Sequence, residues 1–207
     1  MKSLGLGLFA TLLLFSACGH PAMGAEVDTK KLIDQGSTLM ESEKWSQAVQ
    51  KFEEALRLDP DNEMAKFGLG TAYIKTEQYD KALSMLSPLL KQFPSNPALL
   101  NNVAWVYATS KDPKVRNIDL AISYARDALL IAPNDPNIWS TMAETYYASG
   151  QFDKALRYAR VAIQIAGSDG RGIPNELERL YRKCMLSSGA KEESQEQEPV
   201  PAVEPTE

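Results

Sequence analysis

Few side chains in this 207-residue chain could carry out covalent or metal chemistry. The sequence holds two cysteines, Cys18 and Cys184, and a single histidine, His20. Two cysteines are too few for a disulfide framework, and one histidine cannot build a histidine-based zinc site. Because His20 falls in an N-terminal leader or linker, a catalytic Cys–His dyad is also disfavoured. We therefore expect neither a metal nor a cofactor.

Acidic pairs and a glycine cluster likewise fail to form a catalytic motif. Glu53-Glu54 and Glu192-Glu193 are adjacent in sequence, and adjacent residues on a helix do not face each other. The glycines at 167, 170 and 172 lack the following Lys-Ser/Thr of a phosphate-binding loop, and a turn explains them. The net charge of -5 offers no basic face for nucleic acid. The sequence predicts a protein that is not an enzyme and does not bind nucleic acid.

Cys18 has a more informative context, because it ends an apolar run. The uncharged segment from Leu4 to Phe15 has the length of a signal-peptide core and is shorter than the roughly 20 residues of a membrane-spanning helix. The stretch Phe15-Ser16-Ala17-Cys18 resembles the lipobox of bacterial lipoproteins, although Phe15 stands where that family usually has leucine. The resemblance implies that residues 1–25 form a leader, that cleavage occurs before Cys18, and that Cys18 is lipidated.

Two other interpretations of the leader stay open. A secretory signal cut after Gly24 or Ala25 would discard Cys18, and an uncleaved anchor would retain the apolar run. All three place the domain outside the cytoplasm. Gly19 follows the cysteine where an aspartate would direct inner-membrane retention in enteric lipoproteins. The resemblance therefore implies an outer-membrane lipoprotein facing the periplasm, with a soluble periplasmic protein as the alternative.

The rest of the chain repeats with a period of 34 residues, and this periodicity predicts the fold. Four positions separated by 4, 3 and 5 residues recur in four copies. The copies are Ala48, Phe52, Ala55 and Pro60; Ala82, Leu86, Leu89 and Pro94; Ala121, Ala125, Ala128 and Pro133; and Ala155, Ala159, Ala162 and Gly167. Pro94 and Pro133 lie 39 residues apart, so the third copy contains five extra residues.

Each unit contains two amphipathic segments. Small residues seven apart, with an apolar residue between them, form one helix face that can approach a neighbouring helix closely. In the second unit the segments run from about Glu63 to Thr76 and from about Tyr79 to Gln92, and a proline then ends the unit. Two short helices cannot bury both of their faces alone, whereas stacked pairs can. The pattern therefore predicts an all-α solenoid.

These positions resemble the tetratricopeptide repeat (TPR) family. The family signature of the first helix includes a Leu-Gly or Leu-Ala type pair and a tyrosine, present here as Leu69-Gly70 with Tyr73 and, in variant form, as Val103-Ala104 with Tyr107 and Met142-Ala143 with Tyr146. The resemblance implies a right-handed superhelical solenoid of four helix hairpins, at residues 29–62, 63–96, 97–135 and 136–169, within a TPR domain spanning 26–188.

Two segments follow the repeats. Residues 174–187 carry an apolar stripe and predict a C-terminal capping helix that covers the last repeat, with Cys184 buried on this stripe. Residues 189–207 hold six glutamates, three prolines and no aromatic residue, a composition typical of disorder. A proline-rich docking peptide is the alternative for this tail.

The resemblance also implies a binding surface. In the family, the first helix of each hairpin lines a concave groove through repeat positions 2, 5, 9 and 12. The matching residues that we select for partner binding are Ile33, Ser37, Met40, Phe67, Thr71, Ile74, Asn101, Trp105, Ser140, Glu144 and Tyr147. Aromatic anchors among them suit a peptide or helix with apolar side chains. The alternative is that some of them pack between helices or lie under the capping helix.

Basic residues are scarce at these positions. Lys30 is the only basic residue among all sixteen matching positions, so the carboxylate clamp of chaperone-binding members is not expected. The insertion SKDPKVRNID, residues 110–119, is locally basic through Lys111, Lys114 and Arg116. It is either a neutral extension of a turn or a secondary contact for an acidic partner, glycan or lipid head group.

Together these features predict a non-catalytic protein–protein interaction scaffold or adaptor in the bacterial cell envelope. It would bind a protein partner in its concave groove and attach to the membrane through an N-terminal lipid. The alternatives are a soluble periplasmic assembly subunit of an export or maturation complex and a self-assembling structural array. The oligomeric state stays open, as does the partner, because a fold does not specify a function.

Overall fold

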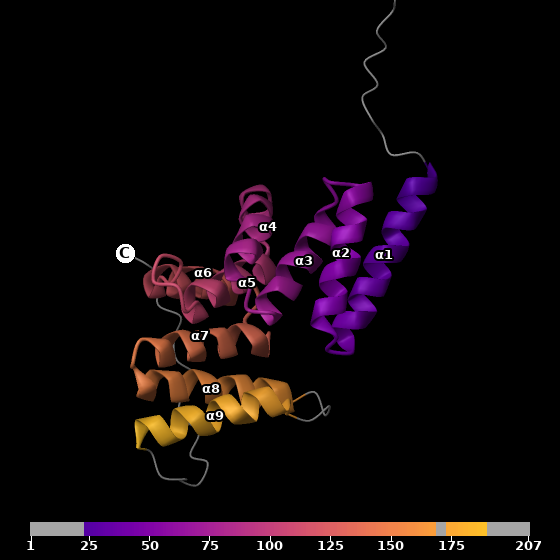
Figure 1. Cartoon of the computed structure of the whole chain (residues 1–207). Coiled ribbons are helices and arrows are strands. Elements are labelled where there is room, and N and C mark those ends of the chain that lie inside the picture. The colour runs from indigo at the N-terminus through magenta and orange to yellow at the C-terminus, as the bar shows by residue number, and fades with distance from the viewer. Residues whose placement is uncertain (1–22, 169–172, 190–207) are drawn as a thin grey trace, which may run out of the picture.

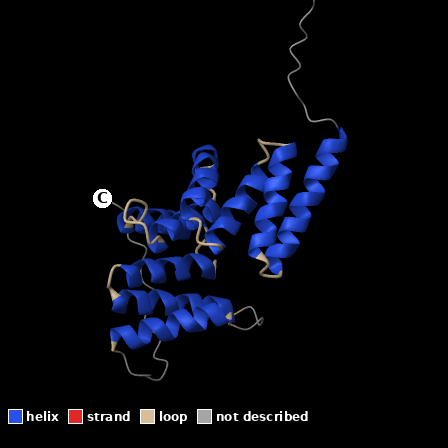
Figure 2. Ribbon diagram, viewed as in Figure 1, coloured by secondary structure: helices blue, strands red, loops and turns tan. Residues whose placement is uncertain are grey.

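In a computed structural model, which describes residues 23–168 and 173–189, every regular element is an α-helix (Figures 1 and 2). The helices of this part are α1 (Met23–Glu41), α2 (Trp45–Leu58), α3 (Glu63–Lys75), α4 (Tyr79–Gln92), α5 (Pro97–Thr109), α6 (Ile118–Ile131), α7 (Pro136–Ala148), α8 (Phe152–Gly167) and α9 (Asn175–Ser188). They pack as four consecutive hairpins followed by a single helix, so the predicted fold class is confirmed. Cys18 and the tail from residue 190 lie outside the described residues.

The turns inside three of the hairpins share one backbone conformation. Glu43, Glu77 and Gly150 occupy the same repeat position, and their φ angles are 56°, 57° and 77°. In each turn the next residue donates a backbone hydrogen bond to the carbonyl oxygen five residues before it, as Lys44 does to Leu39 over 2.8 Å. This left-handed closure is a common way to end a helix, and glycine adopts it with the least strain.

The turns between hairpins are set by polar caps. Asn62, Asn96 and Asp135 precede α3, α5 and α7, and each side-chain oxygen accepts a hydrogen bond from a backbone N–H of the first helical turn. Each cap follows the proline that ends the preceding repeat by two residues. The Pro-x-Asn or Pro-x-Asp sequence thus stops one helix and starts the next.

The two helices of each hairpin meet through residues of complementary size. A Cβ atom added to Gly36 would lie 2.8 Å from the Phe52 ring, and one added to Gly70 would lie 2.6 Å from Leu86 Cγ. The matching residues of the later hairpins are all alanine and fully or almost fully buried. The four pairs are Gly36 with Phe52, Gly70 with Leu86, Ala104 with Ala125, and Ala143 with Ala159. Where the second helix contributes a large side chain, the first therefore contributes none.

The buried apolar side chains form two clusters that meet at α5. Leu99 and Val103 belong to the cluster built with α1–α4, whereas Leu100 and Ala104 belong to the cluster built with α6–α9. We refer to residues 23–96 as the N-terminal half and to residues 97–189 as the C-terminal half. Figure 1 shows α1 to α3 side by side at one end of the array and α7 to α9 stacked at the other.

Helix α9 has the pattern of the first helix of a further repeat. Pro174 stands at the repeat position that Pro97 holds at the start of α5. Three apolar positions of α5 also have counterparts in α9: Leu100 with Leu177, Val103 with Leu180, and Tyr107 with Cys184. All three α9 residues are buried against the C-terminal half. Ile173, an apolar residue just before the helix, is 37% exposed. Among the described residues, no helix has both the length and the apolar character needed to cross a bilayer.

Candidate functional site

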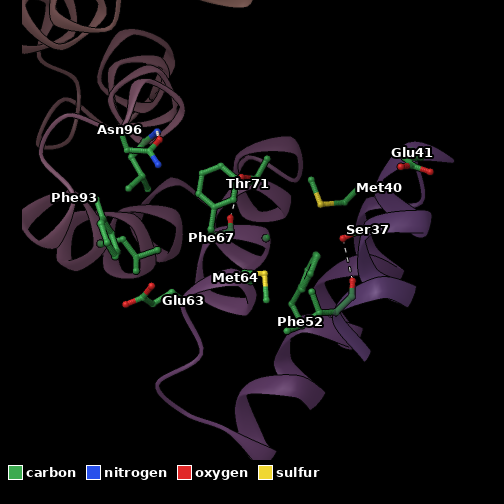
Figure 3. A pocket seen from close by; sticks show the side chains of 14 residues that line it. Ser37, Met40, Glu41, Phe52, Glu63, Met64, Phe67, Thr71, Phe93 and Asn96 are labelled. Atoms are coloured by element: carbon green, nitrogen blue, oxygen red, sulfur yellow. Dashed lines mark hydrogen bonds between the residues drawn. The ribbon is translucent and has the colours of Figure 1, made fainter. Parts of the chain in front are cut away.

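A hollow of about 610 Å³ opens in the N-terminal half between α1, α3 and the corner that joins α4 to α5 (Figure 3). We call it the N-terminal groove. Five of the residues predicted for partner binding line it: Ile33, Ser37, Met40, Phe67 and Thr71. The other lining residues are Glu41, Phe52, Glu63, Met64, Gly68, Leu89, Phe93, Asn96 and Leu99. The groove is therefore built from three successive repeats.

The floor of the groove depends on two glycines. The Phe52 ring extends from α2 between Gly36 of α1 and Gly68 of α3, and a Cβ atom at Gly68 would lie 2.5 Å from Phe52 Cε1. Because neither glycine has a side chain, the ring fills the space between the two helices. It is itself almost fully buried, so it supports the groove from below.

Large apolar side chains stand at the mouth of the groove. Figure 3 shows Met40 on one side, Phe93 on the other and Phe67 between them. Met64 is 64% exposed and Phe93 is 39% exposed, and both lie on the lining. Such a concentration of water-exposed apolar surface in a concave site is typical of a surface that another molecule covers.

The hydroxyl groups of the lining are already engaged as donors. Ser37 donates to the carbonyl oxygen of Ile33 over 3.0 Å, and Thr71 donates to that of Phe67 over 2.9 Å. Thr71 Oγ1 also accepts a hydrogen bond of 3.0 Å from Asn102 Nδ2. These side chains can therefore offer a ligand acceptor oxygens and no further hydroxyl hydrogens.

Negative charge borders the groove. Its charged lining residues are Glu41 and Glu63, and among the described residues no lysine, arginine or histidine lines it. The Gln92 side-chain amide donates to a Glu63 carboxylate oxygen, which leaves the charge of that carboxylate in place. Lys30 is exposed on α1 and does not contribute to the lining. The carboxylate clamp that the sequence disfavoured has no cationic group to build it here.

Six of the predicted binding residues do not line the N-terminal groove, and three of these are Ile74, Asn101 and Trp105. Ile74 is buried in the apolar cluster of the N-terminal half, and Trp105 is half-buried against the same cluster. The Asn101 side-chain oxygen is buried and has no hydrogen-bond partner among the described residues. For Ile74 and Trp105, contacts between helices take the place of an open surface, which is one of the alternatives stated for these positions.

The other three predicted residues lie on α7. Ser140 donates to the carbonyl oxygen of Asn137 over 3.0 Å. Glu144 Oε2 pairs with Lys183 Nζ of α9 at 3.1 Å. Lys183 Nζ also lies 3.8 Å from the centre of the Tyr147 ring, and Ser187 donates to the Tyr147 hydroxyl oxygen over 3.2 Å. Glu144 and Tyr147 are therefore engaged by the capping helix, as the second alternative held.

The insertion connects the turns of its neighbouring repeats. Lys111 Nζ pairs with Glu77 Oε2 at 2.7 Å, and this carboxylate raises the pKa of Lys111. Arg116 Nη2 donates to the carbonyl oxygen of Ala148 over 2.5 Å. The insertion thus joins the second and fourth hairpins at one edge of the array. All three basic residues of the insertion are exposed, and the backbone N–H of Lys114 donates to Asp112 Oδ1 over 2.8 Å.

Sequence reasoning did not select Glu41, Glu63 and Met64 on the first helices, and it missed the part of the groove that lies outside those helices. Phe52 comes from α2 and Phe93 from the corner after α4, and the family positions we used cover neither. One signal was present for Phe52, because Gly36 and Gly68 are glycines in the interior of predicted helices. A glycine at such a position indicates close approach of another group. We find no comparable signal for Phe93.

The described residues offer little for catalysis. No group of three or more His, Cys, Asp or Glu side chains among them could hold a metal ion. Cys184 is fully buried, and burial together with the nearby Glu144 carboxylate raises the pKa of its thiol to about 11. A thiol in this state is a poor nucleophile at neutral pH.

Comparison with known proteins decides the family. A family model described as tetratricopeptide repeat matches residues 39–106 and 115–171, more than half of the chain. The chain belongs to the tetratricopeptide repeat family. The family resemblance that the repeat positions carried is thereby confirmed.

Solved TPR proteins share this arrangement of helices. The thermophilic TPR protein TTC0263 of Thermus thermophilus is 20% identical with a TM-score of 0.66, over 78% of this chain and 83% of that one. MamA from Desulfovibrio magneticus RS-1 is 18% identical with a TM-score of 0.54, over 68% of this chain and 77% of that one. At these identities the likeness shows the fold alone.

One curated relative is a subunit of a protein complex and is itself a much longer chain. The anaphase-promoting complex subunit CDC16 of Saccharomyces cerevisiae is 27% identical over 128 residues, which is 61% of this chain. The match spans only 14% of the length of that subunit. Like the solved structures, it supports the TPR fold.

Proposed function

We propose that this TPR protein is a non-catalytic scaffold that holds a segment of a protein partner in its N-terminal groove. The observation that carries the proposal is the exposure of Met64 and Phe93 at the mouth of a concave site whose floor is apolar. Apolar anchors in a preformed pocket supply most of the binding energy at protein interfaces. The fold supports the same role, because TPR domains generally bind protein partners.

The setting we propose is the bacterial cell envelope, with the protein attached to the outer membrane through lipid on Cys18. Support for it comes from the leader, which resembles that of bacterial lipoproteins. The soluble periplasmic alternative is separated from it by Cys18→Ala. That substitution should release a lipoprotein from the membrane fraction, whereas the distribution of a soluble subunit would not change.

An in-cell crosslinking pull-down tests the groove. We expect the double variant Met64→Glu, Phe67→Glu to lose the partner recovered by the wild-type chain, because two carboxylates would replace apolar contacts. Leu130→Glu is the matched control, since Leu130 is 62% exposed on α6 and lies outside the groove. Helical circular dichroism establishes that all variants are folded. If the groove variant retains every partner that the control retains, the proposal is wrong.

The remaining alternative, a self-assembling array, needs a separate test. Light scattering of the purified chain over a wide concentration range would show concentration-dependent growth for an array. A constant mass together with groove-dependent capture of another protein would favour the scaffold.

A further inference from the structure

The N-terminal groove combines apolar contact surface with charge of one sign. Its large exposed side chains are Met64 and Phe93, and its charged side chains are Glu41 and Glu63. Figure 3 places the two carboxylates on opposite sides of the opening, with Phe67 between them. An occupant that covers the apolar centre therefore meets a carboxylate on each side.

The neutral polar groups of the groove also favour one kind of ligand. The Ser37 and Thr71 hydroxyls donate to backbone carbonyls of their own helices, and the Asn96 side-chain oxygen caps α5. Without free hydroxyl hydrogens or cationic side chains, the site is poor in donors and rich in acceptors. A ligand carboxylate would find the Asn96 side-chain amide as a donor but no cationic partner, whereas an ammonium or guanidinium group would meet Glu41 or Glu63.

We propose that the occupant is a cationic peptide segment, with two or three large apolar side chains flanked on both sides by lysine or arginine. The apolar side chains cover Met40, Phe67 and Phe93, and the flanking cations lie near Glu41 and Glu63. This inference rests on the proposed function and names the chemistry of the partner. The acidic tail of the chain itself, with its six glutamates after residue 189, has the wrong charge for this site.

The length of the segment follows from the groove. Its lining on α1 runs from Ile33 to Glu41, eight residues apart, which spans roughly 12 Å along a helix. A peptide of about twelve residues covers this distance in either helical or extended form. The anchors and both flanking charges can therefore come from one short segment.

A random peptide library tests the inference even while the partner is unidentified. The purified full-length chain is used to select from displayed random peptides of about twelve residues, a length that covers the groove. Selected peptides are then measured by fluorescence anisotropy against wild type, Phe67→Glu and the double variant Glu41→Gln, Glu63→Gln. Asp119→Asn with Glu176→Gln is the matched control, because it removes two exposed carboxylates of the C-terminal half and changes the net charge equally.

We expect peptides that lose binding in Phe67→Glu to be rich in large apolar residues and to carry net positive charge. Their affinity should fall about tenfold in Glu41→Gln, Glu63→Gln and less than about twofold in the control, since two rim ion pairs are lost only in the first. Higher salt should weaken binding to wild type and have little further effect on the groove variant.

Two results would overturn the inference, and they are distinguishable. If peptides depend on Phe67 but are neutral or acidic, or bind Glu41→Gln, Glu63→Gln as tightly as wild type, the charge assignment is wrong while the groove function stands. If no selected peptide depends on Phe67, both the inference and the proposed function fail.

Discussion

The two halves of the molecule use one repeat in different ways. In the N-terminal half the second helix of each hairpin carries a large residue, Phe52 or Leu86, and the first helix has glycine opposite it. In the C-terminal half both positions are alanine, and aromatic bulk lies elsewhere, in the contacts of Tyr158 with Trp139 and Tyr146. Both halves thus keep the same helix-hairpin backbone, but their large buried side chains stand at different repeat positions.

This difference extends to the concave face. In the N-terminal half the first helices leave a groove with exposed apolar side chains, whereas Glu144 and Tyr147 of α7 are contacted by α9. A groove position is therefore open to a partner only where no helix of the same chain covers it. Substitutions in each half test this difference.

The largest effect is expected at the cap. Leu180→Ala should lower the free energy of unfolding by about 3 kcal/mol, because Leu180 is buried between α9 and the rest of the C-terminal half. Leu186→Ala on the same helix should change it by less than about 0.5 kcal/mol, since Leu186 is 79% exposed. Denaturant unfolding measures both.

Hydrogen exchange then shows where this stability is lost. In a repeat protein each unit contacts mainly its neighbours, so protection should fall in α7 and α8 and persist in α1 to α3. A uniform loss of protection along the chain would show that the two halves unfold as one unit. The two halves would then not differ in local stability.

The next effect tests the glycine contact beneath the groove. Gly68→Ala should destabilise the fold by about 1.5 kcal/mol, because its methyl group would overlap the buried Phe52 ring and the cost exceeds the gain in helix propensity. Gly167→Ala is the control, as its Cβ would lie 3.7 Å from Ile173 Cγ1, an ordinary contact. Adding Phe52→Leu should recover part of the loss; purely additive effects would contradict the proposed overlap.

A smaller effect is expected at the left-handed turn position, which holds Glu43 and Glu77 in the N-terminal half and Gly150 in the fourth hairpin. Glu43→Gly should stabilise the protein by about 0.5 kcal/mol, because glycine adopts a positive φ without strain. Gly150→Ala should destabilise it by about 1 kcal/mol, although its Cβ would meet nothing within 4 Å. Thermal unfolding of both variants shows whether each one is more or less stable than wild type. Equal shifts of both in the same direction would contradict the explanation by backbone conformation.

The smallest effect at neutral pH concerns one tyrosine in each half. Burial raises the pKa of Tyr73 and of Tyr158 to about 12, helped by Glu53 in the first case and by Tyr146 in the second. A pKa above the ordinary value of 10 means that the stabilisation is complete below pH 10 and is lost as the pH rises toward 12. Phenylalanine at either position should therefore flatten the fall in unfolding free energy above pH 10. An unchanged slope would exclude that tyrosine as a cause.

Much of the fold followed from the sequence, because it is encoded locally. Small residues at fixed spacing, a proline at each repeat end and the Asn or Asp caps specify helices and turns through contacts within one repeat. The whole array then forms by stacking of these repeats. Because the pattern occurs four times, each copy independently indicates the same helix hairpin.

The groove was only partly predictable, because it depends on contacts between repeats. Met40, Phe67 and Thr71 were found by their positions within one helix, whereas Phe93 contributes from a corner and Tyr147 is engaged by a helix 40 residues away at Ser187. A positional rule describes an average repeat. It does not include the contacts that a terminal helix or an insertion makes with that repeat.

The end of the array has one further property, which concerns growth. At the position where each first helix carries Gly36, Gly70, Ala104 or Ala143, α9 carries Tyr181. A following helix requires a small residue there to approach closely, so the bulk of Tyr181 disfavours continued stacking on α9. Head-to-tail contacts between identical chains lead to filaments unless their rotation closes a ring. We therefore expect the Tyr181 ring, which itself packs against the apolar cluster of the C-terminal half, to hinder such growth at the α9 end of the described array.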